Sequence, residues 1–410
     1  EIIDYTGLNL DGASGDFFHC QENAELMELP EGSELFILPD RLPIGIEPDS
    51  GEPALLDSNP YTGERDISAV AAFMAPAHTA IYSAAYQSRD KAPLLPLFAY
   101  TAVGWMDGKF WVAAFRSDQD IRQDTAGFDQ NIINKRTAKK LKQHPDNRLI
   151  QHLGKCCLTY GCPAARNYFL GRWEAPLPSS PTCNAACIGC ISLQPSGCCP
   201  ATQDRIRFTP TAQEIAEIAV PHLKNAPRPV VSFGQGCEGE PLLQAATLEK
   251  SIHLIRQQTN KGTINLNTNA SLPDAVEKLA AAGLDSIRIS MNSARPEFHQ
   301  RYYRPSGFSF KDVRRSIEVM KAARKHVSLN YFILPGFTDD PEEYDALCEL
   351  IAATSPNLIQ LRNLNMDPEH YRKAIQYSPQ TPPLGMLCWL ENLKEQFPAL
   401  NFGYFNPCLN

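Results

Sequence analysis

After Cys190 the sequence alternates between short apolar segments and longer segments of helical periodicity. The apolar segments are rich in Val, Ile and Leu, as expected for strands that are buried on both faces. Strands and helices that follow one another in strict turn indicate parallel βα units with right-handed crossovers. The expected strands are residues 229–233, 263–268, 286–290, 327–333 and 358–362, and the expected helices are residues 244–258, 275–282, 311–325 and 342–353.

This alternation predicts both the fold class and the place of a functional site. One more strand before Cys183 brings the expected number to six, which suits an open partial (β/α)6 barrel of the TIM type rather than a closed eightfold one. A chain of 410 residues has room for this barrel and an additional module. In parallel βα arrays the functional residues lie on the loops that follow the strands. We therefore expect an α/β fold with its site at that edge of the sheet.

The chain before the barrel divides into two parts by composition. Residues 1–128 are rich in Pro and Gly and contain short β-like segments, which predicts an N-terminal β-rich or α+β accessory domain. Within it, Asp107 and Gly108 lie between two β-prone segments and indicate a tight hairpin turn. Residues 129–172 form a connecting segment with helical patterning that contains the first cysteines. Residues 173–410 are then the partial barrel with a C-terminal extension.

Charge and hydropathy limit the partners that the chain can have. The formal net charge is -8 and the pI is about 5.7, so no overall positive field favours a nucleic-acid backbone. No apolar stretch reaches the ~18 residues of a membrane span, and the first residues lack the basic start and apolar core of a secretory signal. We expect a soluble protein that binds neither membranes nor, tightly, nucleic acid.

The cysteines are numerous and unevenly distributed. Nine of the 13 lie within 82 residues, from Cys156 to Cys237. Local cysteine clusters in a long acidic chain favour metal ligation in a reducing compartment over a disulfide framework. The expected location is therefore the cytoplasm.

The most specific motif is the C-x3-C-x2-C segment formed by Cys183, Cys187 and Cys190. Three thiolates so close in sequence can hold three corners of a 4Fe-4S cluster, because short loops let the sulfurs converge. The fourth iron then lacks a protein ligand, and such an open position is where a substrate or cofactor is bound and activated. The alternatives are a structural zinc site, which usually needs four ligands in two pairs, and buried thiols that only pack.

Further motifs follow the ends of successive predicted strands. Together with the cysteine triplet, they make residues from about 173 to 367 resemble the radical SAM superfamily, where SAM is S-adenosylmethionine. The resemblance implies that a glycine turn after the second strand binds the amino group of the SAM methionine through its backbone, while later residues contact the ribose and carboxylate and the last one borders the adenine. In chain order these residues are Gly239, Glu240 and Pro241 in the turn, then Asn269, Ser290, Asn292 and Leu334.

Two positions depart from the family pattern. Gly189 stands before the last cysteine, where many members have an aromatic residue, and Glu238 replaces the first glycine of the family's Gly-Gly-Glu-Pro turn. Neither change removes a ligand of the cluster. They bear on the subfamily and on the pose of SAM.

The resemblance also implies a reaction and its partners. A reduced flavodoxin or ferredoxin supplies one electron through the cluster, SAM is cleaved to a 5′-deoxyadenosyl radical, and the radical abstracts a hydrogen from a peptide or small-metabolite substrate. The barrel wall has to keep water and other donors away from that radical. Arg362 is our candidate catalytic residue for holding the substrate, because an arginine that leaves an apolar strand needs a partner such as a carboxylate.

The remaining clustered cysteines suggest an auxiliary iron-sulfur cluster, which several radical SAM subfamilies carry. Its best ligands would be Cys157 and Cys162, and the further candidates are Cys198, Cys199 and Cys237. The alternative is that these thiols are small buried apolar side chains, a common fate of free cysteine.

Two other functions stay open at this point. A non-catalytic iron-sulfur protein that transfers electrons or senses oxidation would need neither the Gly-Glu-Pro turn nor a three-ligand cluster, and it would produce no 5′-deoxyadenosine. RNA modification by a radical SAM enzyme is disfavoured by the acidic charge, and salt-sensitive binding to tRNA would revive it.

Overall fold

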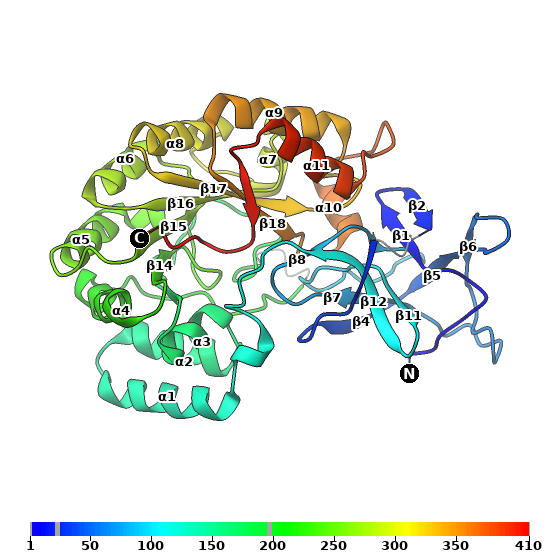
Figure 1. Ribbon diagram of the computed structural model, residues 1–410, viewed down its shortest axis with the longest axis horizontal. Coiled ribbons are helices and arrows are strands. Elements are labelled where there is room, and N and C mark those ends of the chain that lie inside the picture. Colours follow the sequence, from blue (N-terminus) through cyan, green and yellow to red (C-terminus); the bar gives the residue numbers. More distant parts are fainter. Residues whose placement is uncertain (1, 21–24, 195–198, 410) are drawn as a thin grey trace.

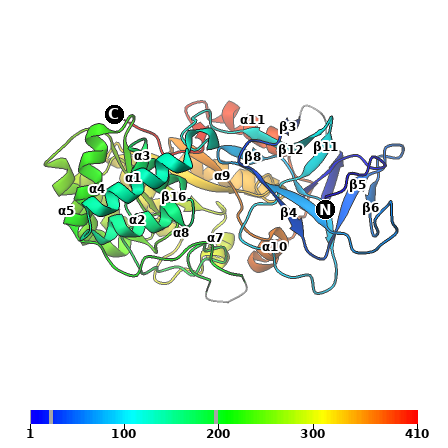
Figure 2. The same cartoon turned by 90° about the horizontal axis from the view of Figure 1, so that it is seen from below.

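The computed structural model describes residues 2–20, 25–194 and 199–409. They form a curved parallel sheet wrapped by helices, with a β-rich module beside one end of it (Figure 1, Figure 2). Three further helices lie beneath the first strands of the sheet in the view of Figure 1. Every helix that the structure describes is too short or too polar to cross a membrane.

The main sheet has seven parallel strands in sequence order. The five strands expected after Cys190 are all present, and β13 is the strand expected before Cys183. The last strand, β19, pairs with β18 and was not expected, because its three residues, Asn-Phe-Gly, include no β-branched residue and only one apolar side chain. The result is the open α/β partial barrel that was predicted, with one strand more. Its strands are β13 (Glu174–Pro176), β14 (Val230–Phe233), β15 (Thr263–Thr268), β16 (Ser286–Met291), β17 (His326–Ile333), β18 (Leu358–Asn363) and β19 (Asn401–Gly403).

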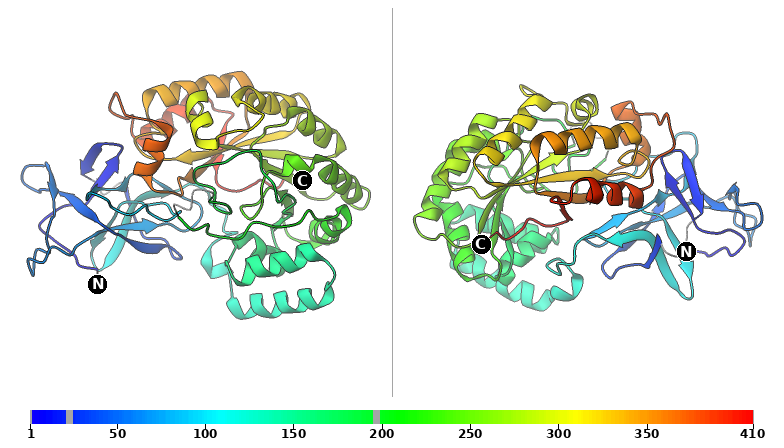
Figure 3. Two further views of the ribbon diagram at one scale, coloured as in Figure 1. Left: turned by 180° about the vertical axis from the view of Figure 1, so that it is seen from behind. Right: turned by 45° about the horizontal axis from the view of Figure 1, so that its top comes forward.

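Helices cover the convex face of the sheet, as Figure 3 shows from two further sides. The alternation of side chains along β16 explains its two faces: Ile287, Ile289 and Met291 are fully buried in the core beneath the helices. Arg288 and Ser290, which stand between them, face the concave interior. The helices are α4 (Ala212–Asn225), α5 (Ala245–Arg256), α6 (Pro273–Ala282), α7 (Pro296–Tyr303), α8 (Phe310–Ala322), α9 (Pro341–Thr354), α10 (Pro368–Ile375) and α11 (Met386–Gln396), with a short 3-10 helix, η3 (Pro241–Gln244).

The helical patterning expected after residue 129 corresponds to α1 (Gln130–Gln143), α2 (Arg148–Leu158) and α3 (Pro163–Leu170). The side chain of Asn147 caps α2 by accepting a hydrogen bond from the backbone nitrogen of Ile150. One face of α2 packs into the same core as the barrel helices, and the ion pair between Arg148 and Glu214 of α4, 2.7 Å long, fixes its start. This segment is therefore part of the barrel's outer layer.

The N-terminal module consists of small antiparallel sheets. The predicted hairpin is present: Met106 pairs with Lys109, and Asp107 and Gly108 both have positive φ, 51° and 76°, as a tight two-residue turn requires. Its strands are β1 (Asp11–Ser14), β2 (Phe17–Cys20), β3 (Leu26–Glu28), β4 (Glu34–Leu38), β5 (Arg41–Ile46), β6 (Pro53–Leu55), β7 (Ala69–Phe73), β8 (His78–Ala80), β9 (Ser83–Ala84), β10 (Tyr86–Ser88), β11 (Val103–Met106) and β12 (Lys109–Arg116), followed by the 3-10 helix η2 (Thr125–Gly127).

Polar contacts join this module to the loops at the carboxyl ends of β17 and β18. The guanidinium of Arg41 and the carboxylate of Asp367 form an ion pair of 2.8 Å, and the two side chains are only 2% and 3% exposed. The amide side chain of Asn363 accepts from the nitrogen of Ala80 and donates to the oxygen of His78, both at 3.0 Å. The module thus lies against the edge of the sheet at which a functional site is expected.

Candidate cofactor site

The cysteine triplet lies on the loop that follows β13, at the carboxyl edge of the sheet. Two hydrogen bonds hold this loop to the end of α7: the nitrogen of Ala186 donates to the oxygen of Tyr303 at 2.9 Å, and that of Ile188 to the oxygen of Tyr302 at 3.1 Å. A turn bond from the nitrogen of Cys190 to the oxygen of Cys187, 3.3 Å long, brings the two thiols to one side.

The three sulfurs lie close enough to influence one another. Burial raises the pKa of Cys187 well above its usual value, and the charges of Cys190 and Cys183 add to the effect. The guanidinium of Arg205 donates to the sulfur of Cys190 at 3.3 Å.

Gly189 leaves room for an aromatic neighbour. A Cβ atom at this position would lie 2.9 Å from the hydroxyl oxygen of Tyr302 and 3.2 Å from the sulfur of Met366. Tyr302 is fully enclosed in an apolar cluster with Ile188 and Met366. The ring of Tyr302, from α7, thus lies directly against Gly189.

The glycine turn after β14 packs directly on the cysteine loop. The nitrogen of Gly239 donates to the oxygen of Ser180 at 2.7 Å, and that of Glu240 donates to the oxygen of Thr182 at 2.8 Å. A Cβ atom at Gly239 would lie 2.0 Å from the oxygen of Thr182 and 3.1 Å from the nitrogen of Cys183. Only glycine fits at this position, because any side chain would push the two loops apart.

Glu238, the second departure from the family pattern, binds the start of the cysteine loop. Its carboxylate accepts hydrogen bonds from the backbone nitrogens of Ser179, Ser180 and Gln235, at 2.8, 3.0 and 2.6 Å, and from the hydroxyl of Ser179. Burial raises the pKa of Glu238 to about 7, while these donors act in the opposite direction. Glu238 therefore positions the start of the cysteine loop relative to the turn after β14.

Glu240 joins the loops after β14 and β15. Its carboxylate accepts from the backbone nitrogens of Leu242 and Asn269, at 2.9 and 2.8 Å, and from the hydroxyl of Thr268. Burial raises its pKa to about 7. The side-chain amide of Asn269 in turn donates to the oxygen of Asn184 in the cysteine loop, at 2.8 Å. Three loops are thereby held as one unit.

The remaining predicted SAM contacts lie on the next two strands. Ser290 is half-buried and pairs with Asn330 of β17 in the sheet register. Asn292 is fully buried, and its amide donates to the hydroxyl of Tyr371 at 3.1 Å. Leu334 belongs to the apolar cluster around Tyr302. The carboxyl ends of the strands thus bring these residues to the edge where the triplet lies.

Arg362, the candidate substrate residue, is accompanied by a second arginine inside the barrel. The guanidinium of Arg362 lies 3.5 Å from the centre of the Tyr404 ring and donates a hydrogen bond of 2.8 Å to the backbone oxygen of Tyr404. Burial, and then the nearby charge of Arg362, lower the pKa of Arg288 to about 9. Within the described part of the chain, the Nε atoms of both arginines and the Oδ1 atom of Asn330 are buried without a hydrogen-bond partner.

Sequence reasoning missed Arg288, although the alternation of Ile287, Arg288 and Ile289 carries a signal. A charged residue between two apolar ones on a central strand has to face the interior of the barrel. The proximity of Arg288 to Arg362 could not be predicted, because β17 separates the strands that carry them, β16 and β18.

The structure divides the auxiliary cysteines among different places. Cys162 and Cys237 lie near Cys156, whereas the sulfur of Cys157 is 3.6 Å from the hydroxyl oxygen of Thr137. Cys199 is buried in the apolar cluster around Tyr302. Cys198 lies outside the described residues. The sulfurs of Cys156 and Cys237 lie within 4.8 Å of each other; Cys237 was among the predicted ligands and Cys156 was not.

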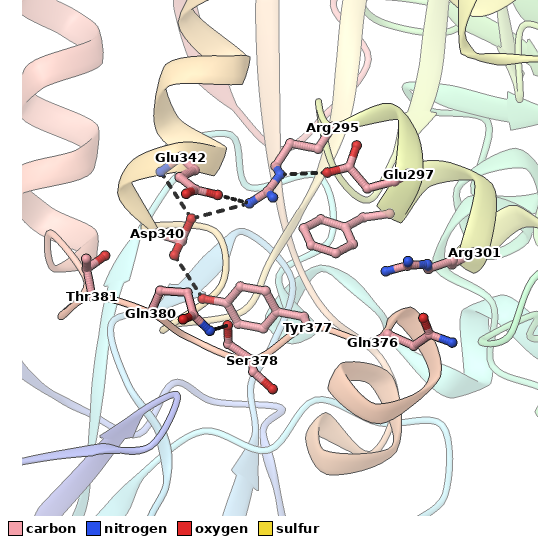
Figure 4. A pocket seen from close by; sticks show the side chains of 11 residues that line it. Arg295, Glu297, Arg301, Asp340, Glu342, Gln376, Tyr377, Ser378, Gln380 and Thr381 are labelled. Carbon is pink, nitrogen blue, oxygen red and sulfur yellow. Dashed lines mark hydrogen bonds and ion pairs between the residues drawn. The ribbon is translucent and has the colours of Figure 1, made fainter.

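A surface pocket of about 350 Å³ near the starts of α7 and α9 holds a network of charges (Figure 4). Arg295 contacts Glu297 at 3.1 Å and Glu342 at 2.9 Å, and Asp340 accepts from the hydroxyl of Tyr377 at 3.1 Å. Because these charges already satisfy one another, the network stabilises the helix starts and offers little to a ligand.

Comparison with known proteins gives one family. Residues 177–348 match the model described as the Radical SAM superfamily. The FeMo cofactor biosynthesis protein NifB of Klebsiella pneumoniae is 28% identical over 128 residues, a match that covers 31% of this chain and 27% of that protein. The matched part is thus about a quarter of the length of this relative.

Solved structures with a similar arrangement include the FeFe-hydrogenase maturase HydG of Carboxydothermus hydrogenoformans, with 15% identity, coverage of 67% of this chain and 70% of that chain, and a TM-score of 0.38. Another is SuiB of Streptococcus suis bound to S-adenosylmethionine, with 14% identity, coverage of 59% and 54%, and a TM-score of 0.41.

Proposed function

We propose that this chain, whose residues 177–348 match the Radical SAM superfamily, cleaves SAM reductively at a 4Fe-4S cluster bound by Cys183, Cys187 and Cys190. The observation that carries the proposal is the contact between the cysteine loop and the turn at Gly239, where only a hydrogen atom separates the two backbones. A non-catalytic iron-sulfur protein has no use for this second loop. SAM cleavage as the activity of the whole protein is part of this proposal, which rests on the cysteine triplet and the glycine turn.

The residues at the site fit such a cluster. Three thiols converge on one loop, each of them half-buried and therefore accessible from one side. Thiolate sulfur is the ligand that iron-sulfur clusters require, and three ligands leave one iron open. When bound, a reduced cluster supplies the electron that cleaves SAM to a 5′-deoxyadenosyl radical, and a reduced flavodoxin or ferredoxin would deliver that electron.

The protein's own part is to bind, orient and exclude water. The turn of Gly239, Glu240 and Pro241 would offer its backbone to the amino group of SAM, held in place by the carboxylates of Glu238 and Glu240. Asn269, Ser290 and Asn292 would contact the ribose and carboxylate, and Leu334 would border the adenine, as the family pattern implies. The apolar cluster of Tyr302 and its neighbours would keep water from the cysteine loop.

The substrate proposed for this site carries an anionic group. Arg288 and Arg362 place two guanidinium groups in the interior, and neither has its Nε atom paired within the described chain. Glu174, whose charge acts on Arg288, is already engaged, because it accepts hydrogen bonds from Ser232 and from Asn406, the latter at 2.8 Å. A substrate carboxylate or phosphate would satisfy the two arginines in the forked geometry that guanidinium favours. A peptide or a small metabolite could supply it.

Replacing Arg288 with methionine should separate a ligand-binding role from a structural one. The buried like charges of Arg288 and Arg362 oppose each other, so Arg288→Met is expected to unfold at the same or a higher temperature than the wild type. Malonate, used as a probe dianion, should raise the unfolding temperature of the wild type by a few degrees and have no effect on the variant.

Arg315→Met serves as the control for that measurement, because Arg315 is an exposed arginine paired with the exposed Asp274. It should keep the malonate effect. A marked loss of stability in Arg288→Met, or a malonate effect that survives in it, would show that the arginine only supports the barrel.

The proposed function is tested by anaerobic reconstitution with iron and sulfide, followed by addition of dithionite and SAM. 5′-deoxyadenosine should form only when both are present, and the reduced protein should show the electron paramagnetic resonance signal of a 4Fe-4S cluster that changes when SAM is added. A reconstituted protein that holds the cluster but releases no 5′-deoxyadenosine would leave electron transfer as its function. The reducing compartment that this chemistry needs is consistent with the cytoplasm.

A further inference from the structure

A second group of metal-binding side chains lies outside the cofactor site. The ligand atoms of His152, Cys156 and Cys237 all lie within 4.8 Å of one another. The Nε2 atom of His152 is 3.5 Å from the sulfur of Cys156. The two cysteines are 2% and 5% exposed, so the group is closed to solvent on most sides. Nothing in the proposed SAM chemistry uses these residues.

The local structure explains why these side chains meet. His152 and Cys156 are four residues apart on α2, so they lie on one face of the helix. Cys237 comes from the loop after β14, where its backbone oxygen accepts a hydrogen bond of 2.7 Å from the nitrogen of Ile206. The group therefore joins the helical segment before the barrel to the loop that continues into the glycine turn.

Cys162 lies beside this group of three. Its backbone nitrogen donates to the backbone oxygen of Cys156 at 3.1 Å, so the chain folds back after α2 and returns to the same place. Its thiol interacts electrostatically with those of Cys156, Cys157 and Cys237. Three sulfurs and one imidazole make a Cys3His donor set, which is one of the usual sets of structural zinc sites.

The spacing of the donors favours one ion over a cluster. Bonds of about 2.0–2.3 Å in a tetrahedral site put neighbouring ligand atoms roughly 3.3–3.8 Å apart. The Nε2 atom of His152 lies 3.5 Å from the sulfur of Cys156, which is within that range, and the sulfur of Cys237 lies within 4.8 Å of both atoms. Ligands of different irons in a cubane have the cluster itself between them.

We propose that His152, Cys156, Cys162 and Cys237 bind one divalent metal ion, zinc by its donor chemistry, in a structural site that fastens α2 to the glycine turn. One ligand of the ion, Cys237, would directly precede Glu238 in the chain, and the carboxylate of Glu238 binds the start of the cysteine loop. The site would therefore stiffen the base of the cofactor site without touching SAM. This role does not depend on the proposed radical chemistry.

The test measures metal in a protein that cannot hold the radical SAM cluster. The variant with Cys183, Cys187 and Cys190 all changed to alanine, purified without oxygen from cells grown with zinc, should contain about one zinc ion per chain and no sulfide. In that background, Cys237→Ser and His152→Gln should each weaken zinc binding by more than the ~10- to 100-fold that the loss of an outer-shell partner costs, as measured by competition with a chromogenic chelator.

Cys157→Ser in the same background is the matched control, because Cys157 follows Cys156 on the helix but faces Thr137. It should retain the zinc. Should Cys237→Ser not fold, cobalt substitution decides the question: with Co²⁺ alone, the triple variant should show the thiolate charge-transfer band and the strong visible bands of a tetrahedral Co²⁺ site, and the added His152→Gln change should alter them.

Three outcomes would overturn the proposal. They are a triple variant without zinc that also fails to bind Co²⁺ tetrahedrally, zinc lost equally from Cys157→Ser, and iron with labile sulfide in place of zinc. All three are read from protein that lacks the triplet, so a failure here is distinct from a failure of SAM cleavage.

Discussion

Changing Cys187 to alanine is expected to reduce the formation of 5′-deoxyadenosine by a factor of ~10³ or more, to the background of the assay. Two cysteines cannot hold a cubane with a single open iron, so SAM would have neither its binding position nor its electron. The measurement is a chromatographic assay of 5′-deoxyadenosine from anaerobically reconstituted protein with dithionite and SAM, together with the iron content.

Cys388→Ala is the matched control, because Cys388 is an exposed cysteine on α11 and belongs to neither cysteine group. This variant should keep full production. Equal 5′-deoxyadenosine from Cys187→Ala and the wild type would exclude the triplet as the site of SAM cleavage. Loss of product in both variants would instead point to a general sensitivity of the fold to cysteine replacement.

Asp367→Ala is expected to lower the free energy of unfolding by about 3–5 kcal/mol, because it leaves the guanidinium of Arg41 buried without a counter-charge. Asp367 also accepts hydrogen bonds from the backbone nitrogens of Leu95, Glu369 and His370, so the change removes the cap of α10 as well. Urea unfolding followed by circular dichroism measures the loss, and the midpoint should fall with little change in slope.

The double variant Arg41→Met with Asp367→Asn provides the comparison. Asparagine keeps an oxygen for the helix cap, and methionine removes the buried charge, so the pair should be markedly more stable than Asp367→Ala alone. Asp367→Ala with wild-type stability would mean that water reaches Arg41 and that the module is only loosely seated on the barrel.

Much of the barrel could be predicted from local patterns. The central strands carry Val, Ile or Leu at alternate positions, and short segments of this kind can be recognised without any knowledge of tertiary structure. The Asp107-Gly108 turn was equally clear, because few residue pairs accept two positive φ angles in succession. β19 was not predictable, since Asn401–Gly403 becomes a strand only through pairing with β18.

The candidate site, too, could be predicted from the sequence only in part. The triplet and the glycine turn are close in sequence and carry their spacing with them. His152 and Cys237 are 85 positions apart, and their meeting depends on how α2 packs against the loop after β14. Glu238 looked like a mere departure from a pattern, and its role is visible only through the backbone nitrogens that it binds. Residues whose role depends on tertiary contacts are the ones that local sequence patterns do not reveal.

The close approach of the N-terminal module to Gly336 sets a rule for anyone who wants to graft a different module onto this barrel. The nitrogen of Gly15 donates to the oxygen of Pro335 at 3.2 Å, and a Cβ atom at Gly336 would lie 1.9 Å from that same nitrogen. A new module that approaches this seam as closely as Gly15 does can be seated only if residue 336 stays glycine. Chimeras should therefore be designed around that residue first.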